Sequence, residues 1–190
     1  MINQQEIAEG VKHILEKGLN INVENNPHLK DTPERVARAY KEVFEGYEES
    51  PYKYDTTFPN PNKNRRDIII LGPITCYSIC SHHILPFKME VYVGYIPNTK
   101  IIGISKIERI TRNICHKLQV QENVGHEIIN VLNKILEPYG VIVYITNSIH
   151  TCMTMRGVNS KNAGLTTKTV DGIFYEKEYE ENFFKMIEQR

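Results

Sequence analysis

The chain has 190 residues, which is enough for one well-buried core or for one core with an appendage. Its 23 lysines and arginines balance its 23 aspartates and glutamates, so net charge draws it neither to nucleic acid nor to a membrane surface. No apolar run approaches the roughly 18 residues that a membrane span needs, and the amphipathic start is unlike a signal peptide. We therefore expect a cytoplasmic protein without nucleic-acid or membrane partners, in which the four cysteines stay reduced.

The N-terminal third of the chain is expected to be helical and then irregular. Apolar residues recur every three or four positions over residues 4–17, which is the spacing of one helix face. A second helix is predicted to begin at Asp31 or Thr32, because either side chain can cap it and Pro33 suits the first turn. Residues 49–64 carry several prolines, asparagines and tyrosines and are predicted to form a long loop.

Strand and helix patterns alternate in the rest of the chain. Ser105 is predicted to cap a helix, and a second helix over residues 124–140 is ended by Pro138 and Gly140. A last helix is expected over residues 177–190. Segments rich in β-branched residues are predicted strands: 66–80, then 88–96 with a turn at 97–98 and a short second strand, then 141–158 as a strand pair or one broken strand.

The order of these elements indicates an α+β fold. Strands that come in pairs predict an antiparallel sheet, and the two helices between the pairs are expected to cover one face of it. A sheet of about four strands has two open edges, and we expect neighbouring copies in an oligomer to extend or close it.

A short segment after the first predicted strand carries possible metal ligands. Cys80 and His83 stand three residues apart, a spacing at which one turn brings a thiolate and an imidazole to one ion. Cys152 offers a third ligand, and His150 precedes it by two positions, so on a strand both side chains would face one cavity. Three protein ligands would leave a fourth zinc position open for water. The alternative is that Cys80 and Cys152 are small buried core residues.

Of the other histidines and cysteines, some are expected to take part in catalysis and others to belong to the hydrophobic core. His82 and His83 are adjacent, so one is expected to bind the metal and the other to face the pocket or solvent. A histidine beside a metal-bound water suits general acid–base catalysis at neutral pH. Cys76 and Cys115 lie in apolar segments and are predicted to be core residues.

Two further groups of residues suggest contacts with a ligand. Basic residues recur beside small turns and would suit a polyphosphate if the fold brings them together, although each one alone fits a solvated surface charge: Arg35, Arg38, Lys106, Arg109 and Arg156. Glu122 follows Gln121 directly before a predicted helix. Its carboxylate could accept the two N–H donors that guanine offers, or it could simply complement the helix dipole.

Seven stretches in order make the chain resemble GTP cyclohydrolase I, the zinc-dependent type I enzyme. They are "DTPERVARAY", "CSHHILPF", "VYVGYIPN", "IIGISKIERI", "LQVQE", "HTCMTMRGV" and "TTKTVDGIF", and together they span residues 31–174. The resemblance implies a tunnel fold, a ββααββ unit with helices on one face of the sheet, behind an N-terminal helical extension. It also implies a ring-shaped homo-oligomer, a decamer, with sites where subunits meet. On this basis residues 1–60 are the helical region and loop, and residues 61–190 are the catalytic domain.

The resemblance also implies a reaction and a set of residues for it. GTP would be hydrolysed at C8 of guanine to 7,8-dihydroneopterin triphosphate and formate, the first step of tetrahydrofolate and pterin biosynthesis, with one Zn²⁺ per subunit. By their positions in the motifs, the residues resemble metal ligands (Cys80, His83, Cys152), proton-transfer histidines (His82, His150), a guanine anchor (Gln121, Glu122, and backbone near Ile104 and Ser105) and triphosphate ligands (Arg35, Arg38, Lys106, Arg109, Arg156).

One residue departs from the family pattern. The family usually carries Glu between the cysteine and the two histidines, and this chain has Ser81. A serine forms hydrogen bonds but brings no charge, so the alternative to the full reaction is a divergent GTP-binding paralogue that performs a partial one. A non-catalytic pterin- or nucleotide-binding ring protein would not need both His82 and His150. The nitrile reductase of the same fold would need a nucleophilic cysteine, and the Cys/His/Cys set argues against it.

Overall fold

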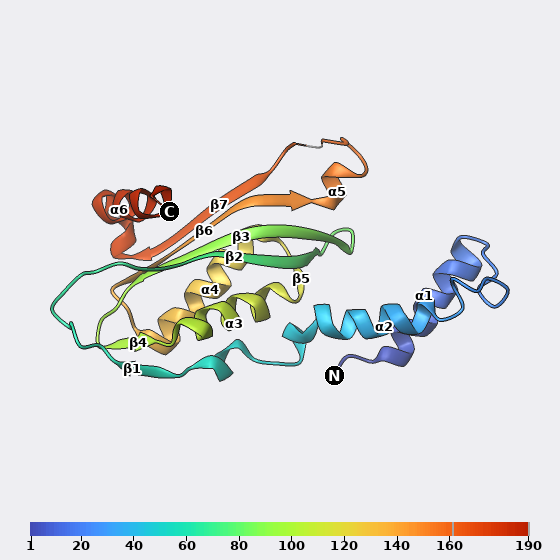
Figure 1. The fold of residues 1–190 in the computed structure, drawn as a ribbon, viewed down its shortest axis with the longest axis horizontal. Coiled ribbons are helices and arrows are strands. Elements are labelled where there is room, and N and C mark those ends of the chain that lie inside the picture. Colours follow the sequence, from blue (N-terminus) through green and yellow to red (C-terminus); the bar gives the residue numbers. More distant parts are fainter. Residues whose placement is uncertain (161, 190) are drawn as a thin grey trace.

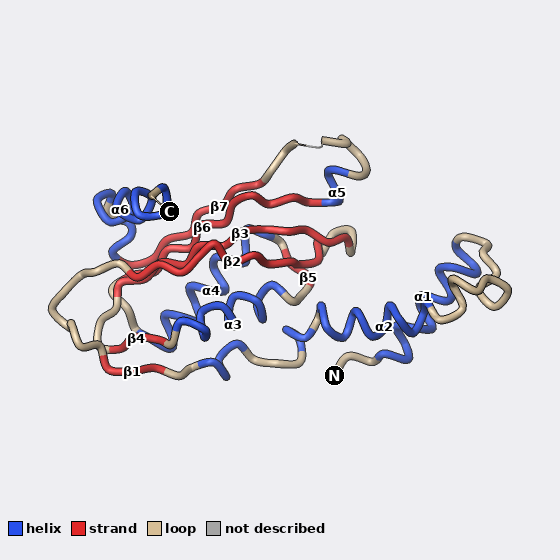
Figure 2. Tube along the Cα trace, in the orientation of Figure 1, coloured by secondary structure: helices blue, strands red, loops and turns tan. Residues whose placement is uncertain are grey.

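The computed structural model describes residues 1–160 and 162–189, and its centre is a five-stranded sheet (Figures 1 and 2). The strand order is β5-β2-β3-β6-β7, with every pair antiparallel except β5 with β2. The strands are β2 (Ile69–Cys80), β3 (Leu85–Ile96), β5 (Leu118–Gln119), β6 (Gly140–His150) and β7 (Leu165–Gly172). None of the helices formed by the described residues is both long and apolar enough to cross a bilayer.

Two long helices cover one face of the sheet, as the sequence predicted. They are α3 (Ile104–Cys115) and α4 (Gln121–Leu136), drawn below the sheet in Figure 1. Ile107, Ile110 and Ile114 of α3 are buried against inward residues of the central strands. Cys76 and Cys115 belong to this core, as predicted. Two local expectations were wrong. The sequence made Ser105 the cap of the first of these helices, but the N-cap of α3 is Gly103. It began the second helix at residue 124, but α4 begins at Gln121 with a polar first turn.

The other face of the sheet is not bare. Helix α6 (Lys177–Glu188) lies across it near the β6–β7 end (Figure 1). Phe183 of α6 is fully buried against Ile142 and Phe174. A Cβ on Gly94 of β3 would lie only 2.8 Å from the Phe183 ring, so the glycine allows the helix to approach the sheet closely. The expectation of helices on one face alone was therefore incomplete, because the C-terminal helix carries its own apolar face to the opposite side.

The last strand is not where the sequence pattern suggested. Residues 141–158 contain one strand, β6, followed by the short helix α5 (Thr151–Thr154). On the side away from β3, β6 pairs with β7, which begins at Leu165 and runs back beside β6 to Gly172. Strand β7 lies at the sheet edge and alternates polar residues with few apolar ones, so its sequence lacks the continuous apolar run that marks β6.

The N-terminal region forms a helical projection beside the sheet (Figure 1). It consists of α1 (Gln4–His13), which continues as a π-helix to Gly18, and α2 (Thr32–Val43), with which α1 packs. The predicted loop over 49–64 holds a 3₁₀ turn (Pro51–Tyr54) and the three-residue strand β1 (Thr57–Pro59). Strand β1 pairs with β4 (Lys100–Ile102), so the expected short strand after β3 joins a second, two-stranded sheet.

Candidate functional site

A pocket of about 270 Å³ opens at the end of the sheet where β2 turns into β3 and β6 ends. Seven of the residues singled out in the sequence line it together: Cys80, His82, His83, Gln121, Glu122, His150 and Cys152. The sequence patterns did not single out the remaining lining residues, which are Gln119, Val120, Met153, Gly164 and Leu165. They lie in or directly beside β5, α5 and the start of β7, which only long-range packing brings to this end of the sheet.

Three residues of the pocket form a cluster that could hold a metal ion. Single ligand atoms of Cys80, His83 and Cys152 all lie within 4.8 Å of one another. Cys80 ends β2 and is buried, while His83 lies in the turn that follows, with its Nδ1 3.8 Å from the Cys80 sulfur. Two thiols and an imidazole are the borderline-soft donors that zinc prefers, and a three-residue set leaves a coordination position for a small ligand. The donor set therefore fits zinc.

The path by which Cys152 reaches the cluster differs from the expected one. The sequence placed Cys152 on a strand with His150, two residues apart on one face. In the structure β6 ends at His150, and Cys152 lies in the first turn of α5. Both side chains still line the same pocket, because the chain turns there instead of continuing straight. Burial and the nearby Cys80 thiol raise the pKa of the Cys152 thiol in the metal-free chain.

His150 is held on two sides. Its Nε2 lies 2.9 Å from Oε1 of Gln121, and its ring stacks on Phe87 at 4.2 Å between centroids and 10° between planes. Phe87 and His150 are register partners in the β3–β6 pair, so the sheet itself sets this stacking. Burial lowers the pKa of His150, although Glu122 opposes the shift, and the neutral imidazole is favoured.

His82 and Ser81 lie in the same turn as His83. Nδ1 of His82 is 3.9 Å from the Cys80 sulfur, and its ring meets that of His83 nearly edge-on, at 79°. His82 is exposed, so it faces solvent at the pocket. Ser81 donates from both its backbone N–H (3.1 Å) and its hydroxyl (3.2 Å) to the carbonyl of Gln119. In the position where the resemblance leads one to expect an acid, this chain therefore ties β2 to β5.

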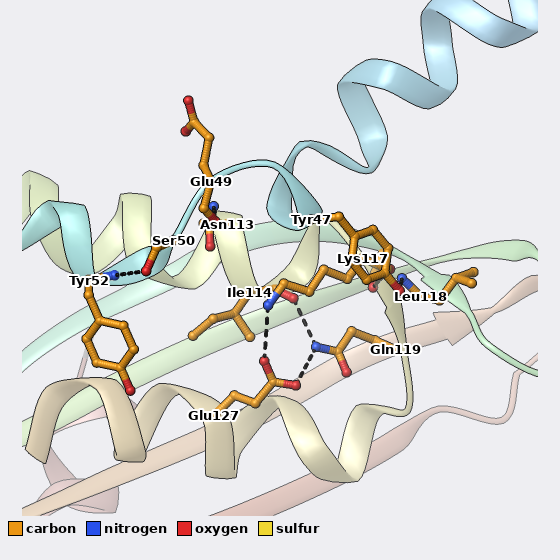
Figure 3. A network of polar contacts seen from close by, with 11 residues as sticks. Tyr47, Glu49, Ser50, Tyr52, Asn113, Ile114, Lys117, Leu118, Gln119 and Glu127 are labelled. Atoms are coloured by element: carbon orange, nitrogen blue, oxygen red, sulfur yellow. Dashed lines mark hydrogen bonds and ion pairs between the residues drawn. The ribbon is translucent and has the colours of Figure 1, made fainter. Parts of the chain in front are cut away.

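A polar network behind the pocket anchors β5 and the start of α4 (Figure 3). The buried amide of Gln119 donates to the carbonyl of Ile114 at 3.0 Å and to Glu127 at 2.9 Å. Lys117 forms an ion pair with the other oxygen of Glu127 at 3.5 Å. The network joins α3, β5 and α4, and it thereby fixes the two residues that follow β5 on α4, Gln121 and Glu122, at the wall of the pocket.

The basic residues do not gather within one chain. Of the five basic residues singled out in the sequence, all of which the structure describes, only Arg156 reaches the pocket region, where its guanidinium donates to Nε2 of His83 at 2.9 Å. Ser105, Lys106 and Arg109 lie in the N-terminal half of α3. This helix is about 18 Å long, and its other end leads into β5 (Figure 1), whose Gln119 lines the pocket.

Arg35 and Arg38 lie on α2, in the helical projection. Arg35 pairs with Asp31 at 3.1 Å, and the described contacts join neither arginine to the pocket.

Comparison with known proteins gives one consistent result. The sequence profile of the family described as GTP cyclohydrolase I matches residues 7–188. The chain is 39% identical to a "GTP cyclohydrolase 1" of Hydrogenobaculum sp. over the full length of both chains. It is 38% identical to that of Clostridium perfringens (98% of this chain, 99% of the other) and 36% identical to that of Bacillus subtilis (91% and 89%).

Among solved structures, an archaeosine synthase QueF-Like in the apo form aligns with a TM-score of 0.46 and 14% identity, over 57% of this chain and 97% of that one. The match of the family profile across nearly the whole chain and the full-length relatives agree with the Cys/His/Cys pocket found at the end of the sheet. The chain belongs to the GTP cyclohydrolase I family.

Proposed function

We propose that the chain is a GTP cyclohydrolase I that opens the guanine ring of GTP in the pocket at the end of the sheet. The observation that carries this proposal is that one cavity is lined by three residues that could hold a metal ion, by two further histidines and by one carboxylate. The products are formate and 7,8-dihydroneopterin triphosphate. The family match and full-length relatives that bear this enzyme's name support it.

One Zn²⁺ per subunit is proposed at Cys80, His83 and Cys152. Two thiols and one imidazole support zinc rather than Mg²⁺ or Ca²⁺, which prefer oxygen ligands. When bound, the ion supplies Lewis-acid activation of water at neutral pH.

His150 and His82 are proposed to move protons during ring opening. The lowered pKa of His150 leaves it neutral near pH 7, so it can accept a proton at the free ring nitrogen and return it to N7 of the purine. His82 is exposed and lies in the same turn as His83, one of the proposed metal ligands, which suits proton exchange with solvent.

Glu122 is proposed to recognise guanine. It lines the pocket in the first turn of α4 and is exposed to it, so both carboxylate oxygens can accept from N1–H and the 2-amino group of the base. The resemblance also assigns Gln121 to the base, with backbone groups near Ile104 and Ser105.

The triphosphate is proposed to bind Arg156 of one chain together with basic residues of a second copy. Ser105, Lys106 and Arg109 lie in the half of α3 that is farther from the pocket, which supports a site shared between subunits. The position of Arg35 and Arg38 on the projecting α2 supports it as well. We accordingly propose a tunnel-type ring, a homodecamer by resemblance, in which residues 61–190 form the wall and residues 1–60 the extension.

The test is incubation of the zinc-loaded protein with GTP, with formate and pterin fluorescence measured in parallel. We expect both signals. Absence of formate would contradict the proposal, and formate without a fluorescent pterin would point instead to the partial reaction that a serine at position 81 suggests. Replacing Glu122 by Gln should raise KM for GTP and weaken its preference over inosine triphosphate, which lacks the 2-amino group. An unchanged preference would remove Glu122 from base recognition.

A further inference from the structure

We propose that Gln121 is a positioning residue for His150 rather than a ligand of the base, and that β7 fixes the amide that does this. The inference concerns the orientation and tautomer of the His150 ring in the protein without substrate. Its consequence for turnover rests on the proposed function.

The hydrogen bonds of Gln121 leave one orientation for its amide. Nε2 lies 3.3 Å from the carbonyl oxygen of Leu165 and 3.4 Å from the hydroxyl of Thr167, while Oε1 lies 2.9 Å from Nε2 of His150. A backbone carbonyl only accepts, so the NH₂ group must face Leu165. The amide oxygen must then face the histidine.

This orientation decides which nitrogen of His150 carries hydrogen. An amide oxygen only accepts, so Nε2 of the imidazole donates to it and bears the proton. In the neutral ring the lone pair is then on Nδ1, and Nδ1 is the atom that exchanges a proton with a bound ligand. Without Gln121 the two tautomers would compete, and the ring could present N–H where a lone pair is required.

A second contact restricts the ring in the other direction. Phe87 stacks on the face of the imidazole, with ring planes 10° apart. The amide holds an edge of the ring, and the phenyl group holds its face. Together they remove the rotational freedom that a half-buried histidine would otherwise keep.

The same bonds leave Gln121 little to offer a substrate. Gln121 is 1% exposed, and both of its amide hydrogens already have acceptors on β7. Glu122, its neighbour in the chain, is exposed to the pocket. The two adjacent residues of α4 therefore have different roles: Gln121 holds His150, and Glu122 is free to contact the ligand.

The experiment compares two adjacent variants, Gln121→Met and Glu122→Gln. Methionine keeps the length and volume of Gln121 but has no amide. We expect Gln121→Met to lower kcat by about 10- to 100-fold, the range seen for partners that orient functional histidines, and to leave the binding of GTP to metal-free protein nearly unchanged. Glu122→Gln should show the opposite split, with weaker GTP binding and lost preference over inosine triphosphate.

A spectroscopic measurement tests the tautomer directly. In protein labelled with ¹⁵N-histidine, the His150 signals, assigned by their loss in His150→Asn, should show a hydrogen-bearing Nε2 in the wild type and a mixture of tautomers in Gln121→Met. If Gln121→Met does not fold, Thr167→Val removes one acceptor of the amide and should give a smaller change in the same direction.

Three results would overturn the inference. The first is a wild-type His150 ring with hydrogen on Nδ1. The second is a Gln121→Met variant that loses GTP affinity and keeps kcat. The third is a His150 tautomer that is unchanged in both Gln121→Met and Thr167→Val. Failure of the proposed function is distinguishable, because a wild type that releases no formate but carries hydrogen on Nε2 would refute the cyclohydrolase reaction and leave the inference standing.

Discussion

A close approach between α4 and the sheet predicts that Gly125→Ala is destabilising, although it places a better helix former in a helix. A Cβ at Gly125 would overlap Oγ1 of Thr169 on β7 and lie 3.0 Å from its Cβ. Overpacking of this kind costs about 1–3 kcal/mol, and the gain in helix propensity returns about 1 kcal/mol. Because the overlap is with a short β-branched side chain that cannot swing away, we expect the upper end of that cost and hence a net loss of up to about 2 kcal/mol.

Chemical unfolding measures this effect against a matched control. Gly10 lies inside α1, where an added Cβ would have no neighbouring atom within 4 Å, so Gly10→Ala should stabilise its helix by about 0.5–1 kcal/mol. Midpoints are compared at equal slope m, so that the difference reflects stability alone. Adding Thr169→Ala to Gly125→Ala should restore part of the loss, with a coupling energy above about 1 kcal/mol.

The same substitution should affect activity, since Gly125 lies one turn after Gln121 and Thr169 lies two residues after Thr167. Moving α4 away from β7 would lengthen the bonds from the Gln121 amide to β7. We expect kcat to fall in Gly125→Ala and to recover in the double variant. If Gly125→Ala is as stable as Gly10→Ala, the close contact does not limit the packing of α4 and the reasoning is refuted.

The remaining predictions test the metal ligands, the Ser81 hydrogen bond after β2 and the packing of α6 on the sheet. Cys152→Ala should lose stoichiometric zinc measured by elemental analysis, whereas Cys115→Ala, in the core, should keep it; full retention by the former would contradict the ligand assignment. Ser81→Ala should cost only about 0.5 kcal/mol in urea unfolding, because the backbone N–H of residue 81 still bonds the same carbonyl; a loss above about 1.5 kcal/mol would mean that the hydroxyl matters more. Phe183→Ala should cost about 3–5 kcal/mol and Met186→Ala, on the exposed side of α6, less than about 0.5 kcal/mol; equal effects would show that α6 is not packed on the sheet.

Local patterns predicted most elements and misplaced one strand, for a physical reason. A central strand such as β6 is buried on both faces, so its apolar run is continuous and easy to recognise. Strand β7 is at the edge, and its sequence LTTKTVDG resembles a loop until β6 is beside it. The start of α4 was hidden in the same way, because its first turn is polar.

In the candidate site, too, local sequence predicted some features and the tertiary structure decided others. The sequence by itself determined the family, through seven motifs in order, and the pairing of Cys80 with His83, because three residues of chain span one turn. Only the tertiary structure decided how Cys152 enters the cluster, that Gln121 bonds His150, and that the basic residues of α2 and α3 lie away from the pocket. These relations join residues far apart in the chain, and they depend on sheet register and helix packing, which no local spacing encodes.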